Sequence, residues 1–164
     1  GSRGRCRLGP QRVTVVAVSD TGPLIHLAEI ESLDLLSVCD QLYIPETVYE
    51  ELQHGDVPAG LADLSYELVE ASTQPDTDQL DPGERAAIAV ANSQDAILLT
   101  DDLAARKSAT EAGIEVHGSI GLIALGYARG RIDKSDASSR MRALQRESTL
   151  FITDAVVERG IELL

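Results

Sequence analysis

The chain has 164 residues, of which 43% are hydrophobic and 25% are charged, and this composition fits one globular domain and excludes a disordered chain. No apolar run approaches the roughly 20 residues that a membrane-spanning helix needs. The aromatic content of 3% argues against extended platforms on which bases stack, and the formal net charge of -13 argues at first against a nucleic-acid partner.

Charge is distributed unevenly along the chain. Residues 13–84 contain 16 Asp and Glu but no Lys or Arg, whereas residues 129–146 contain six basic side chains and two acidic ones. A basic region therefore exists within an acidic protein, and it can serve a polyanionic partner.

The first twelve residues and the cysteines bear on domain boundaries and location. Residues 1–12 are basic, and we interpret them as a tag remnant or a disordered extension, so that one predicted domain covers residues 13–164. Cys6 and Cys39 form neither a disulfide framework nor a zinc motif. We therefore expect a cytoplasmic protein without membrane association.

Strand and helix signals alternate through the rest of the chain. Aliphatic runs rich in β-branched residues predict buried strands, and apolar residues at helical spacing predict the helices between them. Asp81, Pro82 and Glu84 form a capping sequence that predicts the start of a helix. In chain order, the predicted elements are a strand at 13–18, a helix from 24 that 33–38 extends or follows, a strand at 42–45, a helix at 47–53, a weak strand at 66–70, a polar turn at 72–81, a helix from 82 to about 92, a strand at 96–99, a helix to 112, a strand at 114–116, and helices from 119 onward with breaks near 130, 135 and 153.

This alternation predicts a three-layer α/β/α sandwich with a mostly parallel central sheet and a helical C-terminus. In such sheets ligands bind outside the carboxyl ends of the strands. Carboxylates recur at those positions. They are Asp20 after the first strand, Glu50 and Glu51 on the helix after the second, Glu84 in the first turn of a helix, and Asp101 and Asp102 after the strand at 96–99.

Carboxylates that converge in this way need a cation. Two unit charges about 4 Å apart repel by about 4 kcal/mol at an effective dielectric constant of about 20, so an isolated cluster would stay partly protonated. Oxygen ligands suit Mg²⁺ or Mn²⁺, and no Cys or His has zinc spacing. A metal held by carboxylates in an open cleft typically positions and activates water for attack on a phosphodiester.

Each acid also has a purely structural interpretation. Asp20 suits a helix cap, Glu84 suits a capping box, and one of Asp101 and Asp102 would cap the following helix. The two glutamates on the helix at 47–53 could belong to a solvated face. The set as a whole, rather than any one member, favours a metal site.

Phosphoryl-transfer receivers and phosphatases also gather aspartates at strand ends. Receivers need an acidic pair after the first strand, and phosphatases of the haloacid type need a second Asp at the position where this chain has Gly22. The sequence disfavours both classes. His26, His54 and His117 have no triad-like context, and we expect them to be structural or exposed.

Five segments carry a family resemblance. They are 18–30 (VSDTGPLIHLAEI), 44–52 (IPETVYEEL), 80–91 (LDPGERAAIAVA), 97–109 (ILLTDDLAARKSA) and 118–132 (GSIGLIALGYARGRI). In this order they resemble the successive motifs of PIN-domain nucleases, in the prokaryotic branch related to VapC-type toxins. The resemblance runs from about residue 15 to the C-terminus.

The resemblance implies a Mg²⁺- or Mn²⁺-dependent ribonuclease, often the toxin of a toxin-antitoxin pair, that forms a homodimer and is inhibited by a small antitoxin in the active-site groove. By motif, Asp20 corresponds to the first catalytic acid, and Glu51, rather than the glutamate before it, to the second. Glu84 stands at the third, where many relatives have Asp. Asp102 or the adjacent Asp101 is the fourth, and all of these except Glu51 are expected metal ligands.

The function that these observations favour is a metal-dependent endoribonuclease. The alternative is a catalytically weak or inactive PIN-like module that acts through protein association. We expect RNA to contact an edge formed by basic side chains. The candidates are Arg85, Arg106, Lys107, Arg129 and Arg131.

Overall fold

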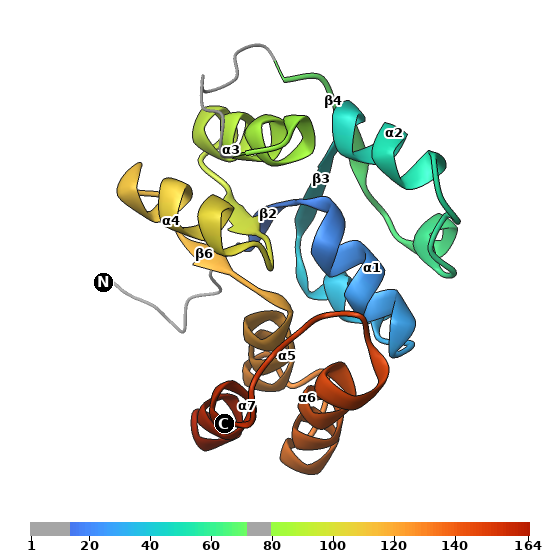
Figure 1. Cartoon of the computed structure of the whole chain (residues 1–164), viewed down its shortest axis with the longest axis vertical. Helices are drawn as coiled ribbons and strands as arrows, with labels where there is room; N and C mark the ends of the chain where they lie inside the picture. The colour runs from blue at the N-terminus through green and yellow to red at the C-terminus, as the bar shows by residue number, and fades with distance from the viewer. Residues whose placement is uncertain (1–13, 72–79) are drawn as a thin grey trace.

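The computed structural model describes residues 14–71 and 80–164 (Figure 1). Within them, five strands form one sheet, in the order β4-β3-β2-β5-β6, and every neighbouring pair is parallel. The strands are β2 (Val16–Ser19), β3 (Gln41–Pro45), β4 (Glu67–Val69), β5 (Ile97–Leu99) and β6 (Val116–His117). The predicted α/β sandwich with a parallel sheet is confirmed.

Helices connect the strands and extend beyond the last one. They are α1 (Thr21–Glu29), α2 (Glu46–Gln53), α3 (Pro82–Gln94), α4 (Leu103–Glu111), α5 (Ser119–Ala128), α6 (Lys134–Glu147) and α7 (Asp154–Glu162), with short 3₁₀ segments η1 (Leu33–Val38) and η2 (Leu61–Asp63). Figure 1 shows α5, α6 and α7 grouped at one end of the molecule. In the described part of the chain, no helix is long and apolar enough to cross a membrane.

The two faces of the sheet have separate apolar clusters because successive side chains of a strand point to opposite sides. Ala17 and Leu99 belong to the cluster that includes α1, α2, α5 and α6. Val18 and Leu98 belong to the cluster with α3 and α4. Burial of the central strands on both faces explains why they appear as nearly continuous apolar runs in the sequence.

The structure refines several predicted boundaries. The first strand of the described sheet begins at Val16, and position 13 lies outside the described residues, as does most of the predicted polar turn. Residues 33–38 form a separate 3₁₀ segment, so they follow α1 and do not extend it, because the chain turns at Glu31, where φ is 54°. The predicted strand at 114–116 begins at Val116, since the N–H of Ile114 still bonds Ala109 in the turn that closes α4.

The packing of α7 generates a stability prediction. A Cβ atom at Gly160 would lie 2.8 Å from Cγ2 of Ile120 and 3.1 Å from Sδ of Met141, which is fully buried. We expect Gly160→Ala to lower the free energy of unfolding by about 1–2 kcal/mol through overpacking, measured by urea denaturation. Gly55→Ala is the matched control, because nothing lies within 4 Å of its Cβ position. Equal stability of the two variants would contradict this packing.

Candidate functional site

The centre of the site is the junction between the ends of β2 and β5. Ser19 pairs with Leu99, the backbone N–H of Asp20 donates to the carbonyl oxygen of Leu99 at 2.9 Å, and Thr100 follows. The hydroxyl of Thr100 donates to Oδ2 of Asp20 at 2.8 Å, and the N–H of Thr21 donates to Oδ1 at 2.7 Å. Asp20 is only 5% exposed, so its carboxylate is held in a fixed position at the carboxyl edge of the sheet.

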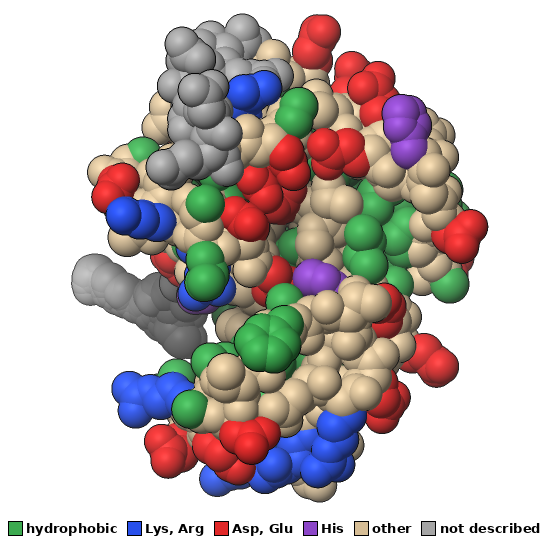
Figure 2. Space-filling model, in the orientation of Figure 1, with side chains coloured by type: hydrophobic (Ala, Val, Ile, Leu, Met, Phe, Trp, Pro, Cys, Tyr) green, Lys and Arg blue, Asp and Glu red, His purple; other side chains and the backbone are tan. Residues whose placement is uncertain are grey.

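A cavity of about 260 Å³ opens above this junction, and five carboxylates line it. Its lining residues are Asp20, Thr21, Gly22, His26, Asp81, Glu84, Asp101, Asp102 and Leu150. Figure 2 shows the acidic side chains gathered in the hollow between α1, α3 and α4. Convergence of acids from distant parts of the sequence at one edge of the sheet is what the strand-end pattern predicted.

Burial and neighbouring charges change the proton affinity of Asp20. Burial raises its pKa from 3.8 to about 6, and the charges of Asp81 and Glu51 also raise it. The hydrogen bonds from Thr100 and Thr21 act in the opposite direction but do not cancel the effect. The carboxylate therefore gains from any cation that enters the cavity.

Glu84, in the same cavity, is the second acid with a raised pKa. It completes a capping box at the start of α3: its N–H donates to Oδ1 of Asp81 at 2.8 Å, and its Oε1 accepts the N–H of Asp81 at 3.0 Å. Burial raises the pKa of Glu84 to about 7, with further contributions from the charges of Asp81, Asp102 and Asp20. The cap and the shared negative charge exist together, so the structural interpretation of Glu84 does not exclude a functional one.

Asp101 and its neighbour have different surroundings. Oδ1 of Asp101 accepts the backbone N–H of Ser119 at 2.7 Å, while Oδ2 accepts the Ser119 hydroxyl at 2.6 Å and lies 2.8 Å from Nδ1 of His26. Burial by itself raises the pKa of Asp101, but the hydrogen bonds from His26 and Ser119 outweigh it and hold the pKa below its usual value. Asp101 thus joins β5 to α1 and to the start of α5.

Asp102 is the member of the pair whose charge raises the pKa of Glu84. Its Oδ2 caps α4 by accepting the N–H of Ala105 at 2.8 Å, and its own N–H donates to the Thr100 hydroxyl. Within the described residues its Oδ1 has no hydrogen bond, and its charge contributes to the raised pKa of Glu84. The two positions that the sequence left open therefore have distinct roles.

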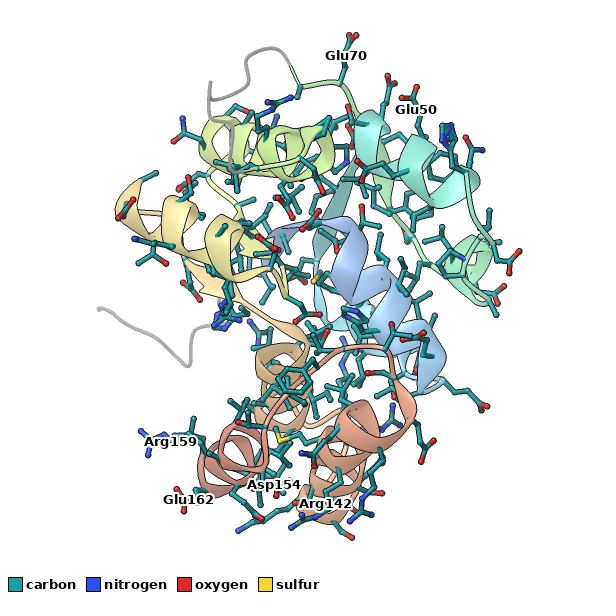
Figure 3. All side chains as sticks on the ribbon, in the orientation of Figure 1. Glu50, Glu70, Arg142, Asp154, Arg159 and Glu162 are labelled. Atoms are coloured by element: carbon teal, nitrogen blue, oxygen red, sulfur yellow. The ribbon has the colours of Figure 1, made fainter. Side chains whose placement is uncertain are left out.

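Glu51 lies beside the cavity rather than in its lining. Its Oε1 accepts the hydroxyl hydrogen of Thr21 at 2.7 Å, and its charge raises the pKa of Asp20. The carboxylate occupies the space that a Cβ atom at Gly83 would need, so glycine there permits the approach of α2 and α3. Glu50, by contrast, points away from the body of the protein (Figure 3).

Sequence reasoning missed three residues of the lining. Asp81 was interpreted only as a cap, although its position before Pro82 at the carboxyl edge could have indicated proximity to the other acids. His26 was expected to be structural or exposed; it is 16% exposed, contacts Asp101 and lines the cavity. Leu150 comes from the segment between α6 and α7, and no local signal could have revealed it.

The basic candidates for RNA contact are not gathered at one place. Nη1 of Arg131 donates to the hydroxyl of Ser37 at 3.0 Å on η1, near the amino-terminal edge of the sheet and away from the acids. Arg106 lies close to the cavity lining, because a Cβ atom added at Gly118 would contact both Nη1 of Arg106 and Oδ1 of Asp101. Arg85, next to Glu84 on α3, and Arg106, on α4, belong to elements that border the site; Lys107 follows on α4, and Arg129 ends α5.

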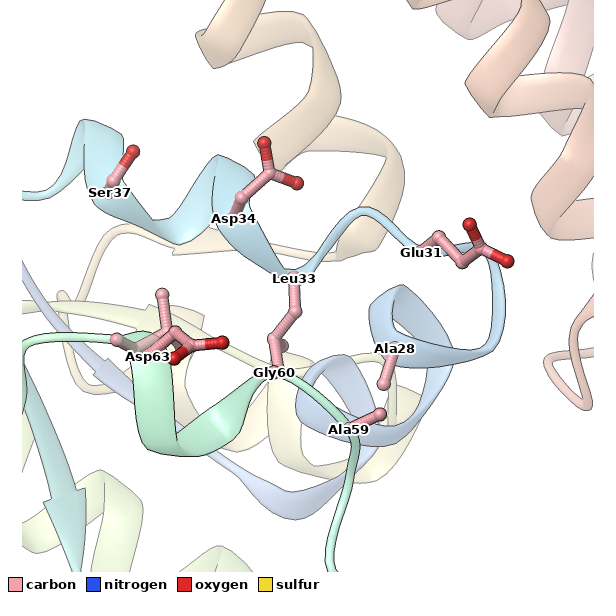
Figure 4. Close-up of a pocket in the computed structure, with 9 residues that line it drawn as sticks. Ala28, Glu31, Leu33, Asp34, Ser37, Ala59, Gly60 and Asp63 are labelled. Atoms are coloured by element: carbon pink, nitrogen blue, oxygen red, sulfur yellow. The ribbon is translucent and has the colours of Figure 1, made fainter.

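A larger cavity, of about 400 Å³, lies between α1, η1 and η2 (Figure 4). Its lining mixes apolar side chains with Glu31, Asp34 and Asp63, and it contains none of the predicted site residues. Size alone therefore does not locate the chemistry, and the smaller acidic cavity is the candidate site.

The donor atoms of the acidic cavity fit a hard divalent cation in their chemistry. They are carboxylate oxygens, and burial together with their mutual repulsion raises the pKa values of Asp20 and Glu84 toward neutrality. Across residues 14–71 and 80–164, however, no group of three or more His, Cys, Asp and Glu side chains is already arranged to hold a metal ion. Mg²⁺ is commonly held by one or two carboxylates together with water molecules, so a preformed three-residue group is not required.

Comparison with known proteins supplies a family match. The model of a family described as DUF3368, PIN domain, matches residues 16–164. No curated protein matches the chain. Among solved structures, a PilT N-terminus domain protein from the hyperthermophilic archaeon Sulfolobus solfataricus P2 is 23% identical, with a TM-score of 0.56 over 67% of this chain and 92% of that chain. This last similarity supports the fold alone.

The raised pKa values generate a pH prediction for the metal-free protein. Between pH of about 4 and 7 the folded protein binds more protons at Asp20 and Glu84 than the unfolded chain does, so their contribution to stability is complete below about pH 4 and is lost as the pH rises through about 6 and 7. We expect Asp20→Asn to gain stability relative to the wild type over this range, measured by urea unfolding in EDTA. The exposed Glu50→Gln variant is the control, and a pH-independent difference for Asp20→Asn would contradict the electrostatics.

Proposed function

This chain belongs to the PIN-domain family, a nuclease-type fold, and from that membership we propose that it is a divalent-metal-dependent endoribonuclease. The observation that carries the proposal is the shared negative charge of Asp20, Glu84 and Asp102 in one open cavity at the carboxyl edge of the sheet. Helix capping accounts for an acid at each helix start. The open cavity that these acids share, where their charges raise the pKa of Glu84, is the feature that a cation would use.

Asp20, Glu84 and Asp102 are the residues that would hold Mg²⁺ or Mn²⁺, with Asp81 beside them. When bound, such an ion supplies activation of water and stabilisation of the oxygen that leaves the phosphate. The protein itself contributes position: Thr21 and Thr100 fix both oxygens of Asp20, and a capping hydrogen bond fixes Glu84. Rotation of these side chains is therefore restricted before a substrate arrives.

We assign Asp101 a positioning role in this proposal. Its carboxylate is occupied by Ser119 and His26, and it ties the start of α5 to the end of β5. Glu51 acts on the site through Thr21 and through its charge on Asp20. Both residues thus shape the cavity without being in the group that would hold the metal.

RNA is the substrate that we propose. Arg85, Arg106 and Lys107 lie on α3 and α4, the two helices whose first turns border the cavity, and are the favoured candidates for phosphate contacts. The family resemblance also supports, as proposals, a homodimer and a small antitoxin that occupies the cavity.

A second candidate function is a PIN-like module that binds metal weakly and acts by protein association. One observation favours it, namely that the described residues contain no preformed group of three metal-ligating side chains. Metal-dependent stabilisation and catalysis distinguish the two candidates.

The nuclease proposal predicts cleavage of single-stranded RNA in Mg²⁺ or Mn²⁺ and its loss in EDTA. Asp20→Asn and Asp102→Asn should each lower kcat by more than about 100-fold, because each removes charge at the cation position while keeping side-chain volume. Gel analysis of a labelled RNA provides the measurement. Glu50→Gln, an exposed acid on α2 that points away from the cavity, should retain activity.

A thermal melt gives a second readout of the same prediction. Mg²⁺ or Mn²⁺ should raise the Tm of the wild type and raise that of Asp20→Asn much less, since bound ligand stabilises the folded state. Cleavage that persists in EDTA, or equal cleavage by wild type and Asp20→Asn, would refute the proposal. Absence of both cleavage and metal-dependent stabilisation would favour the non-catalytic module.

The two adjacent aspartates allow a separate prediction. Asp101→Asn places an NH₂ group among donors from Ser119 and His26, so it should lower the free energy of unfolding by about 1–3 kcal/mol. Asp102→Asn keeps a good helix cap and should change stability by less than about 1 kcal/mol while abolishing activity. Urea unfolding and kcat are measured together, with Ser119→Ala as a control for the first effect. The reverse pattern would show that the assignment is inverted.

A further inference from the structure

The segment between α6 and α7 places an exposed aromatic side chain next to the acidic cavity. Leu150 lines the cavity, and Phe151, the only phenylalanine of the chain, follows it with 88% of its surface exposed. The position of this aromatic side chain next to a lining residue of the candidate site, rather than its exposure alone, makes Phe151 a candidate for contact with a substrate.

Hydrogen bonds fix the backbone that carries Phe151. The N–H and hydroxyl of Thr149 donate to Oε1 of Glu29 at 2.8 and 2.9 Å, which ties the segment to the end of α1. On the C-terminal side of Phe151, Nε2 of Gln145 donates to the carbonyl oxygen of Ile152 at 3.3 Å. The phenyl group thus extends into solvent from a backbone that is anchored on both sides.

A second exposed apolar side chain follows one of the lining acids in the sequence. Leu103 is 81% exposed in the first turn of α4, directly after Asp102, which lines the cavity. Figure 2 shows apolar side chains on two sides of the acidic hollow, over the start of α4 and over the segment between α6 and α7. The acidic side chains therefore have exposed apolar side chains beside them.

We propose that Phe151 stacks on a nucleobase next to the phosphate that the acidic cavity receives, with Leu103 against the base on the other side. The inference rests on the proposed function and adds to it the side chain that contacts an unpaired base beside the cut. In a single strand each phosphate lies between two nucleosides whose bases are unpaired. A metal-binding acidic cavity with apolar side chains beside it can therefore receive a phosphate and contact the neighbouring bases. Stacking is tolerant of sequence, and Phe151 therefore selects for strandedness more than for base identity.

The arrangement favours RNA over a protein partner. A stable protein interface needs a contiguous apolar core within a buried area of about 1,200–2,000 Å². Here Leu103 and Phe151 each adjoin a residue of the cavity lining, and five acids belong to that lining. Leu103 and Phe151 directly follow the lining residues Asp102 and Leu150, so a substrate bound in the cavity would lie close to both.

The test compares Phe151→Ala, Phe151→Trp and the wild type on a short single-stranded RNA with one mapped cut. Phe151→Ala should raise KM by about 10-fold with kcat nearly unchanged, and Phe151→Trp should restore it, because an aromatic face is the group required. Leu163→Ala removes another exposed apolar side chain, on the last turn of the chain after α7, and should leave KM unchanged. At 88% exposure, truncation of Phe151 should not affect folding.

An RNA with an abasic nucleotide next to the cut isolates the contact. On that RNA the wild type should lose its advantage over Phe151→Ala, since the base that stacks is absent. Fluorescence anisotropy of the same labelled RNAs in Ca²⁺ gives affinity independently of cleavage.

The outcomes separate the two levels of the proposal. If the wild type cleaves and Phe151→Ala has the same KM, or an equal defect on the abasic RNA, the stacking inference is overturned while the nuclease stands. If Phe151→Ala instead changes the molecular mass in solution with KM unaltered, Phe151 belongs to a protein interface and the inference is overturned. If the wild type neither binds nor cleaves RNA, the proposed function fails and the inference fails with it.

Discussion

The register between β2 and β5 is the constraint on which the candidate site depends. Because Ser19 pairs with Leu99, the next residue of each strand emerges at the same edge, and Asp20 and Thr100 are brought within hydrogen-bond distance. A shift by one residue would exchange the side chains that pack in the two apolar clusters and would separate Asp20 from Thr100. The hydrogen bonds that hold Asp20 are thus a consequence of how the sheet pairs.

Helix capping and the clustering of acids are two results of the same geometry. In a parallel α/β sheet each helix that follows a strand begins at the carboxyl edge, and a helix start favours an aspartate. Asp20, Asp81 and Asp102 cap α1, α3 and α4, and all three line one cavity. The positive ends of the helices offset part of the repulsion, yet the pKa of Asp20 still rises because burial outweighs this help. Structural and functional interpretations of these acids are therefore compatible.

The acidic side chains of the protein lie in more than one structural setting. Some acids enter the cavity, while others pair with the basic region near the C-terminus. Nε of Arg140 donates to Asp136 at 2.9 Å, and its Nη1 donates to the hydroxyl of Ser32, which joins α6 to the segment before η1. Arg131 likewise binds Ser37. Part of the basic stretch that the sequence offered for a polyanionic partner thus holds helices together.

The sequence by itself determined the order of elements, the parallel sheet, the family resemblance and the candidate acids near strand ends, since these follow from local periodicity and from where strands end. It left open how two adjacent acids differ, and the tertiary structure decided this. Both line the cavity, but Asp101 accepts hydrogen bonds from Ser119, 18 residues away, whereas the charge of Asp102 raises the pKa of Glu84. The participation of His26 and Leu150 also depended on folding, because their contacts join segments far apart in the chain. Local patterns cannot encode such contacts, since only the packing of α5 and of the C-terminal helices against α1 brings those side chains to the edge of the sheet.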